Sequence, residues 1–415
     1  MTANAYYDTF CGPEATYAPC TAPVGVVYLA PFDLLVLTEA NWTWAGQVPT
    51  GPSAVVEFNP VTLLPVARLN LSCTPGFPYY PGTGSDLFVP CGGPILVVSV
   101  PADREVGSIS LPFEVVSMTF DTQNGYFYTG GWNSSGTMEV GGINLQTMAP
   151  ADLFLVPGGT FIGSYDVGGA YLLAYDPAAN ALLMPNVSSD NDASGTSLLG
   201  LDPETGAAAL VAAIGGPILS IAVSPTSDQI LTTTDVPYSV DVLNAQSYAQ
   251  EARVTLPTCF PGVCAGGDAQ DVLIDPGHGD AYLLTSLALD VLNLSTLSIV
   301  SSTFDYGYGT QGSGAYVPGV DRVFGTYNLI LEEIPGFMIQ LDHGSYEVLS
   351  SLLWLPTAEA ILGLGTGLGA VLAVFRGLGP PVPPRVKDPP RPWMRAPPTE
   401  TDERFWPYGD PNLRR

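Results

Sequence analysis

Basic residues are nearly absent from most of this chain. Lysine occurs once, at Lys387, and residues 1–375 hold 4 arginines against 34 acidic side chains. The last 40 residues differ, with 8 basic and 5 acidic side chains. An acidic body without a basic patch argues against nucleic-acid binding, which depends on phosphate contacts. Such a surface would approach neutrality in acid, so an acidic exterior and a biased genome explain it equally well.

Groups that carry catalysis are scarce as well. The chain has two histidines, His278 and His343, and both lie in turn sequences, which favours solvated turn residues over catalytic ones. No Gly-x-Ser-x-Gly elbow, phosphate-binding loop or dinucleotide fingerprint occurs. We therefore predict no catalytic residues and no organic cofactor, and a non-enzymatic role is favoured over an enzymatic one.

The six cysteines fall into three close pairs: Cys11/Cys20, Cys73/Cys91 and Cys259/Cys264. Six cysteines allow 15 pairings, but loop-closure entropy favours local ones, and the absence of Cys-x-x-Cys spacing disfavours zinc. Disulfides imply an oxidising compartment. Five Asn-x-Ser/Thr sequons, candidates for glycosylation, agree with that location: Asn41, Asn70, Asn133, Asn186 and Asn293. Residues 1–7 lack the regions of a signal peptide, so export requires a signal upstream or a fragmentary sequence.

One turn motif recurs along the chain: an apolar run, then Asn or Asp, then Thr or Ser three residues later. Copies lie at Asn59/Thr62, Asn144/Thr147, Asp202/Thr205, Asn244/Ser247, Asn293/Thr296 and Asp342/Ser345, with a degenerate one at Val100–Arg104. An Asx side chain can accept a hydrogen bond from the backbone two residues on, and the hydroxyl supports the next corner. The spacing therefore predicts hairpin turns in a repeat architecture.

A second motif alternates with the first from Val24 onward: apolar strand, turn, apolar strand. These turns lie at Ala30-Pro31, Tyr80-Pro81, Asp121-Thr122, Asp176-Pro177, Ser224-Pro225, Asp275-Pro276 and Val317-Pro318. Each repeat then holds two hairpins in about 45 to 50 residues, the size of one propeller blade. Seven turns of each kind predict an all-β, seven-bladed β-propeller. A β-sandwich and a solenoid are the alternatives.

The pattern is clearest in Ile274-Asp275-Pro276, Ala281-Tyr282-Leu283 and Val291-Leu292-Asn293. It resembles the YVTN-type seven-bladed β-propeller repeat proteins of prokaryotic cell surfaces, with an archaeal source favoured. The resemblance covers residues 24–353 and implies a fold and a surface location rather than a chemistry. The first inner strand is expected near Val24–Tyr28, so no strand swap is expected to close the ring.

The repeating pattern of strands and turns ends at Leu353. Leu352–Phe375 is apolar apart from Glu359, long enough to span a bilayer as a helix, and Arg376 and further basic residues follow it. A glycine-rich last strand on the propeller is the alternative. The predicted divisions are a leader with a candidate disulfide (1–23), the propeller (24–353), a transmembrane helix (354–376) and a proline-rich basic cytoplasmic tail (377–415).

One segment has the spacing of an ion-binding loop. Asp190, Asp192 and Ser194 alternate along the chain and end at Gly195, which suits calcium. The acidic residue expected twelve positions along is missing, because Leu201 stands there. A plain acidic loop is therefore the favoured interpretation, and calcium is the one ion that the sequence suggests.

The favoured function is a membrane-anchored extracellular propeller that binds an unidentified protein or glycan as an adhesion or interaction module. Its candidate contact residues are aromatic: Trp42, Trp44, Tyr79 and Tyr80. A lactonase-like or quinoprotein-like propeller enzyme is the alternative, because a fold does not determine its chemistry. A structural component of the cell envelope is a further alternative.

Overall fold

The fold is built from antiparallel sheets whose strands follow one another along the chain, as the two alternating turn motifs predict. The structure is a computed structural model that describes residues 20–42, 53–121, 123–135, 138–156, 172–186, 196–224, 226–234, 238–257, 259–260, 263–264, 269–285, 288–304, 310–328, 337–342 and 348–353. All of its strands belong to one unit, Met1–Thr357. The second unit, Ala358–Arg415, lies outside the described residues.

Six sheets have four strands each. The first two are β1 (Cys20–Leu29), β2 (Leu34–Trp42), β3 (Ser53–Phe58), β4 (Pro65–Leu71), and β8 (Phe113–Asp121), β9 (Tyr126–Asn133), β10 (Met138–Asn144), β11 (Pro150–Leu155). The next two are β12 (Ala174–Asp176), β13 (Ala181–Asn186), β14 (Ser197–Leu201), β15 (Ala208–Ala213), and β16 (Ile218–Ser224), β17 (Gln229–Thr234), β18 (Ser239–Asn244), β19 (Gln250–Thr255). The last two are β22 (Ala269–Asp275), β23 (Asp280–Thr285), β24 (Ala288–Asn293), β25 (Ser298–Phe304), and β26 (Thr310–Val317), β27 (Arg322–Asn328), β28 (Phe337–Asp342), β29 (Val348–Leu353). A short ladder, β20 (Cys259–Phe260) with β21 (Val263–Cys264), precedes β22.

The remaining sheet has three strands, β5 (Asp86–Pro90), β6 (Ile95–Ser99) and β7 (Arg104–Ile109). The structure thus has six four-stranded blades, one fewer than the seven predicted. The segment that would supply the missing inner strand contains Pro75, Pro78 and Pro81, which have no N–H to donate to a ladder. It pairs with β5 through an isolated antiparallel bridge, Tyr79 to Phe88, and a bond from Gly76 N to Pro90 O, so the chain reverses after Tyr79 without forming a regular inner strand.

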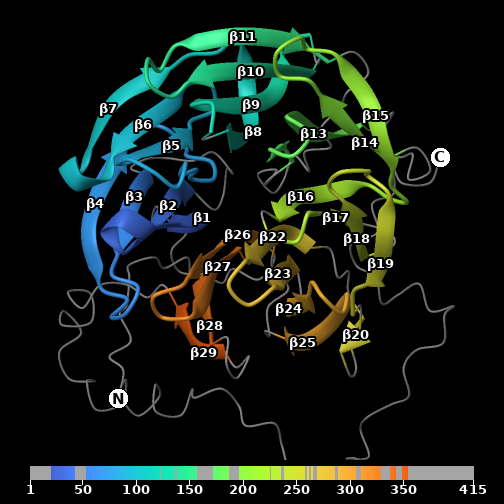
Figure 1. Ribbon diagram of the computed structural model, residues 1–415. Helices are drawn as coiled ribbons and strands as arrows, with labels where there is room; N and C mark the ends of the chain where they lie inside the picture. Colours follow the sequence, from blue (N-terminus) through green and yellow to red (C-terminus); the bar gives the residue numbers. More distant parts are fainter. Residues whose placement is uncertain are drawn as a thin grey trace, which may run out of the picture. The chain divides into compact units, whose positions relative to one another are not determined.

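The sheets are arranged around a ring, with the first strand of each four-stranded sheet innermost and the fourth outermost (Figure 1). Strands in the middle of a sheet, such as β3 and β23, are buried along their whole length because neighbouring sheets cover both faces. Outer strands such as β4 and β19 are mostly exposed. This difference explains why the middle strands read as unbroken apolar runs.

Seven hydrophobic clusters lie among the described residues, and each is shared between two neighbouring sheets. One of them joins the two ends of the unit: Val26 and Leu35 of the first sheet pack with Val317 and Phe324 of the last. Among the described residues, every sheet consists of strands that follow one another along the chain, and no swapped strand closes the ring, as expected. The core is therefore a series of seams between blades.

The Asx-capped turns join third strands to fourth strands where the repeat motif predicts them. The side-chain oxygens of Asn59, Asn144, Asp202, Asn244 and Asn293 each accept the backbone N–H three residues on, at 2.8 to 3.2 Å. The degenerate copy at Val100 is a short 3-10 helix, η2 (Val100–Ala102), and a similar one, η1 (Ala30–Phe32), joins β1 to β2. Ser345 of the last copy lies outside the described residues.

Two predicted boundaries need correction. The first strand begins at Cys20 rather than Val24, because Cys20–Pro23 continue to pair with β2 beyond a bulge at Pro23/Gly25. Leu352 and Leu353 end β29 instead of starting a helix. Within the described part of the chain, no helix has the length and apolar character needed to cross a bilayer. The segment 354–376, for which such a helix is predicted, lies outside that part.

Candidate functional site

The turns between first and second strands share one backbone design. Several of them end in a residue with a left-handed φ, which is 51° at Asp33, 49° at Asn180 and 53° at Asp321. Asp and Asn tolerate this region better than other non-glycine residues. In these three turns the tyrosine five residues earlier donates its hydroxyl to that Asx side chain, over 2.9 to 3.0 Å, in the pairs Tyr28–Asp33, Tyr175–Asn180 and Tyr316–Asp321. The tyrosine fixes the Asx side chain at the end of the turn.

Asp275, the last residue of β22, organises the turn that leads to β23. Its carboxylate is almost fully buried; Oδ1 accepts the N–H groups of Gly277 at 2.9 Å and His278 at 3.3 Å. Its Oδ2 lies 2.6 Å from Nδ1 of His278. Gly279, with φ of 72°, then closes the turn in a conformation that suits glycine. The buried carboxylate therefore holds the imidazole in one place.

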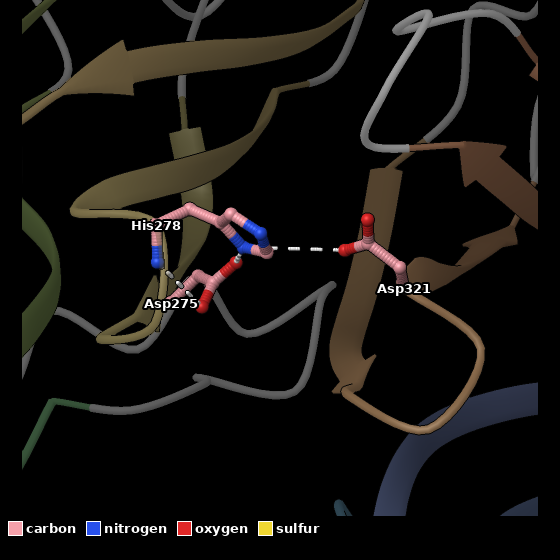
Figure 2. A group of neighbouring side chains, drawn as sticks. All are labelled: Asp275, His278 and Asp321. Atoms are coloured by element: carbon pink, nitrogen blue, oxygen red, sulfur yellow. Dashed lines mark hydrogen bonds and ion pairs between the residues drawn. The ribbon is translucent and has the colours of Figure 1, made fainter.

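A second carboxylate reaches the same imidazole from the neighbouring sheet (Figure 2). Asp321, in the turn between β26 and β27, has Oδ1 4.0 Å from Nδ1 of His278. The Tyr316 hydroxyl lies 3.5 Å from that nitrogen, and its ring meets the imidazole edge-on. The side chains of His278 and Asp321 are 41% and 46% exposed, so solvent reaches the group from one side. The cluster bridges two blades.

The surrounding carboxylates favour the protonated imidazole. The hydrogen bond that His278 donates to Asp275 raises the pKa of His278, and the charges of Asp275, Asp321 and Asp280 act in the same direction. Burial and the hydrogen bond to Asp321 raise the pKa of Tyr316, so its hydroxyl stays protonated. The cluster is an acidic site that favours positive charge.

The chemistry of these groups suits a metal ion. One ligand atom from each of Asp275, His278 and Asp321 lies within 4.8 Å of the other two. An imidazole nitrogen with two carboxylate oxygens is a donor set that zinc and other divalent transition metals accept. This group is hard to predict from the sequence, because Asp321 approaches from another sheet. The Tyr-x-x-x-x-Asp spacing of Tyr316 and Asp321 is the signal that would have placed Asp321.

Both histidines were expected to be turn residues, and His278 is one. Its ion pair with Asp275 and its approach to Asp321 go beyond a solvated turn. His343 lies outside the described residues. The suggested calcium loop, Asp190, Asp192 and Ser194, also lies outside them, so calcium binding stays a prediction.

Two of the four aromatic contact candidates are described in full. Tyr79 is 4% exposed, so the prediction that it lies in an exposed binding loop is wrong. It packs with Phe88 and Phe127 in a seam between sheets, because the proline-rich segment lies against β5. Tyr80 is half-buried and donates its hydroxyl to Gly84 O at 3.0 Å. Trp42 is the last residue of β2, and its side chain lies outside the description. Trp44 lies wholly outside the described residues.

The disulfide Cys73–Cys91 is confirmed. It joins the segment after β4 to the turn between β5 and β6, across a Cα–Cα distance of 5.6 Å, and staples a local loop as predicted. Cys259 and Cys264 are opposite one another in the β20–β21 ladder, with side chains outside the description. Cys20 begins β1 and Cys11 lies outside the described residues, so their pairing stays a prediction.

The sequons occupy different environments, and their glycosylation stays a prediction. Asn70 is exposed on β4. Asn133 and Asn186 are half-buried at the ends of β9 and β13, and Asn133 Nδ2 donates to Glu139 Oε1 at 2.6 Å. The side-chain oxygen of Asn293 caps its turn, and its Nδ2 donates to Asp280 Oδ1 at 2.9 Å. Asn41 lies on β2 with its side chain outside the description.

These features define a β-propeller with an Asp–His–Asp group between two blades. No family model matches the sequence, and a comparison with curated proteins finds no match. Among solved structures, hydrazine synthase from Kuenenia stuttgartiensis is similar at a TM-score of 0.56 and 12% identity, over 84% of this chain and 99% of that one. At this identity the similarity supports the propeller fold alone, and kinship with YVTN-type proteins stays a proposal.

Proposed function

We propose that this chain is a membrane-anchored, extracellular, seven-bladed β-propeller that serves as an interaction module for a protein or glycan. The observation that carries the proposal is the internal capping of its turns. Side chains within each capped turn satisfy the turn's own backbone, as Asn59 and Asn293 do. A rigid scaffold of this kind presents neighbouring loops at little entropic cost, which favours binding through those loops.

The seventh blade in this proposal is the three-stranded sheet β5–β7 with the segment around Gly76–Tyr79 in the inner position. That segment bonds to β5 through Gly76 N to Pro90 O at 2.8 Å and through the mutual bonds of Tyr79 and Phe88 at 2.8 and 2.9 Å. The seven shared clusters support it, since a closed ring has as many seams as blades. A YVTN-type relationship, which the sequence motifs suggest, agrees with seven.

The extracellular, anchored arrangement rests on two further features. The Cys73–Cys91 disulfide is typical of an oxidising compartment. In the sequence, an apolar segment at 354–376 is followed by most of the chain's basic residues, as at the cytoplasmic end of a membrane anchor. Protease applied to intact cells should remove the propeller and leave the tail protected. Release of the whole chain by a high-salt wash would contradict the anchor.

The binding role is tested on the aromatic pair Trp42 and Trp44, at and just beyond the end of β2. Full-length protein in detergent, applied to a glycan array and to proteins of the cell surface, should bind a ligand. Changing Trp42→Ala together with Trp44→Ala should weaken that binding at least tenfold without moving the melting temperature. Trp393→Ala, in the tail, is the matched control and should bind normally. Equal binding by wild type, the double variant and the control would rule out these two tryptophans as the contact.

A propeller enzyme is the second candidate, and the Asp275–His278–Asp321 group is the observation that favours it. A metal held there could activate a water for hydrolysis of a lactone or ester. The test is turnover of a lactone and ester panel with and without added divalent metal. Metal-dependent hydrolysis that is lost in His278→Asn would favour the enzyme over the interaction module.

A further inference from the structure

We propose that Asp275, His278 and Asp321 bind one divalent transition-metal ion, which clamps the blade β22–β25 to the blade β26–β29. The site is independent of the proposed interaction role. It draws one ligand side chain from the second of these blades and two from the first, so an ion held there joins two elements that are otherwise linked by packing and hydrogen bonds. The ligand would be the free ion, and zinc is the probe.

The geometry needs only small side-chain rotations. Ligand atoms bound to one zinc ion lie roughly 3 to 4 Å apart, because each bond is about 2.0 to 2.2 Å long. The imidazole Nδ1 is now 2.6 Å from Asp275 and 4.0 Å from Asp321. Asp275 is anchored by two backbone N–H groups, whereas the side chains of His278 and Asp321 are partly exposed. One buried ligand and two partly exposed ones suit the capture of an ion from solvent.

The chain contains a natural counterpart of this site that keeps the buried aspartate and lacks the other two ligands. At the seam between the blades β8–β11 and β12–β15, Asp121 Oδ1 accepts Asn124 N at 3.1 Å and Asn124 Nδ2 donates to Asp121 Oδ2 at 2.7 Å. Tyr175 donates to Asn180, as Tyr316 does to Asp321. The tyrosines stack alike, Tyr128 on Tyr175 with centroids 6.3 Å apart and Tyr282 on Tyr316 at 6.0 Å.

The comparison separates what the fold requires from what it does not. Asn124 and Asn180 occupy the positions of His278 and Asp321, and the turns and the stacked tyrosines form in both seams. Amide side chains at these positions are therefore sufficient for the turns and the stacked tyrosines to form. An imidazole and a carboxylate in their place add two good metal ligands beside an already buried carboxylate, and this difference points to an ion rather than to turn structure.

The test compares three full-length proteins, each carrying Asp190→Ala and Asp192→Ala so that the acidic loop does not contribute. The first has no further change; the second adds His278→Asn and Asp321→Asn, the amide pair that the chain already uses elsewhere. The third adds Asn124→His and Asn180→Asp. Each is stripped with a chelator and titrated with zinc by calorimetry, and cobalt absorption reports on the ligand set.

The first protein should bind one zinc ion with a melting temperature that rises with zinc concentration. The second should fold normally and lose that ion, with affinity lowered at least tenfold, and the third should bind a second ion. If the first protein binds no zinc, or if the second binds it as tightly as the first, the proposal is wrong. If the second protein folds poorly, a second zinc ion bound by the third protein still supports the proposed set of two aspartates and one histidine.

Discussion

At the scale of single residues, two equivalent buried aspartates show how a neighbouring side chain decides the cost of burial. Asp241 on β18 and Asp290 on β24 each lie three residues before the turn asparagine. Asp241 is opposite Arg253, whose Nε and Nη2 contact its two oxygens at 2.6 and 2.9 Å. Asp290 is opposite Ser302, which bonds one oxygen, and burial raises the pKa of Asp290 to about 6.

Arg253→Ser should give Asp241 the environment that Asp290 has opposite Ser302. Asp241 would stay buried without a cation, so we expect the free energy of unfolding at neutral pH to fall by about 2 kcal/mol, less than for a fully buried pair because Arg253 is 38% exposed. Urea unfolding measures the change, and Arg104→Ser on β7, an exposed position, is the control. A loss no larger than that of the control would show that the pair contributes nothing.

At the scale of elements, each turn between third and fourth strands combines a cap with a left-handed residue. The fifth residue of the motif donates its N–H to the carbonyl of the first, as Leu297 does to Asn293 at 2.9 Å. That residue has a φ of 51° at Leu297 and 56° at both Leu63 and Tyr248, and only Gly206 is a glycine. The Asx cap therefore holds a conformation that the residue itself disfavours.

Asn144→Ala should remove one such cap. The side-chain oxygen of Asn144 accepts Gln146 N at 3.0 Å and Thr147 N at 2.9 Å, and Met148 follows at a φ of 54°. We expect a loss of about 1 kcal/mol in the free energy of unfolding, similar to the loss of a helix cap. Asn144→Asp should be nearly neutral, since Asp202 performs the same role naturally. Equal destabilisation by both changes would contradict the cap.

The outer strands explain most of the exposed aliphatic side chains. Val66 of β4, Val106 of β7 and Val300 of β25 each stand at the one residue that the register skips, and they are 60%, 47% and 49% exposed. A bulge bends an edge strand and interrupts its ladder, which hinders pairing with another chain. These valines are therefore part of edge protection rather than a docking patch.

Sequence predicted what depends on neighbours along the chain and missed what depends on neighbours across a seam. Asn293 and Thr296 bond within their own turn, so their spacing alone revealed the hairpin. The burial of Tyr79 depends on Phe88 and Phe127 of two other strands, and Asp321 meets His278 only because two blades pack together. The missing inner strand of the blade β5–β7 could have been predicted, because Pro75 and Pro78 exclude a regular ladder there.

At the scale of the whole unit, side chains of inner strands accept backbone N–H groups from the neighbouring blade at several seams. Ser117 Oγ accepts Leu173 N at 3.0 Å, and Asp271 Oδ2 accepts Gly314 N at 2.9 Å, each from the next blade's side. At the closing seam, Ser313 Oγ accepts Val26 N at 2.7 Å and donates to Val26 O at 3.2 Å. These bonds, with the shared cluster around Val26 and Phe324, join the two ends of the propeller in place of a swapped strand.

Ser313→Ala should weaken that closure. The change leaves Val26 N and O without the hydroxyl in a buried position, which costs about 1 to 3 kcal/mol in the free energy of unfolding. Hydrogen exchange should show the largest loss of protection in β1 and β26. Ser108→Ala, at an exposed position on β7, is the control. A uniform loss of protection around the ring would argue against a local role for Ser313.

The buried carboxyl groups make the stability of the unit depend on pH in a predictable direction. Burial raises the pKa of Asp271 to about 7, against the opposing backbone N–H bonds, and it raises that of Glu39 to about 7 against the attraction of Arg68. The folded protein therefore holds these protons more tightly than the unfolded chain. Their contribution to stability is fully present below the unfolded pKa values, near 4, and is lost as the pH rises toward 7.

Asp271→Asn should flatten this part of the pH dependence. The wild-type contribution declines between about pH 4 and pH 7 by at most ~1.4 kcal/mol per pH unit for one carboxyl, and an amide, which does not titrate there, removes the slope. Urea unfolding at pH 4.5 and pH 7.5 measures the difference, with Glu105→Gln at an exposed position on β7 as the control. The variant should lose more stability at pH 4.5 than at pH 7.5, relative to wild type. If the pH dependence of the variant equals that of wild type, Asp271 is ionised in the folded protein, and its bonds to Gly314 and Val272 outweigh its burial.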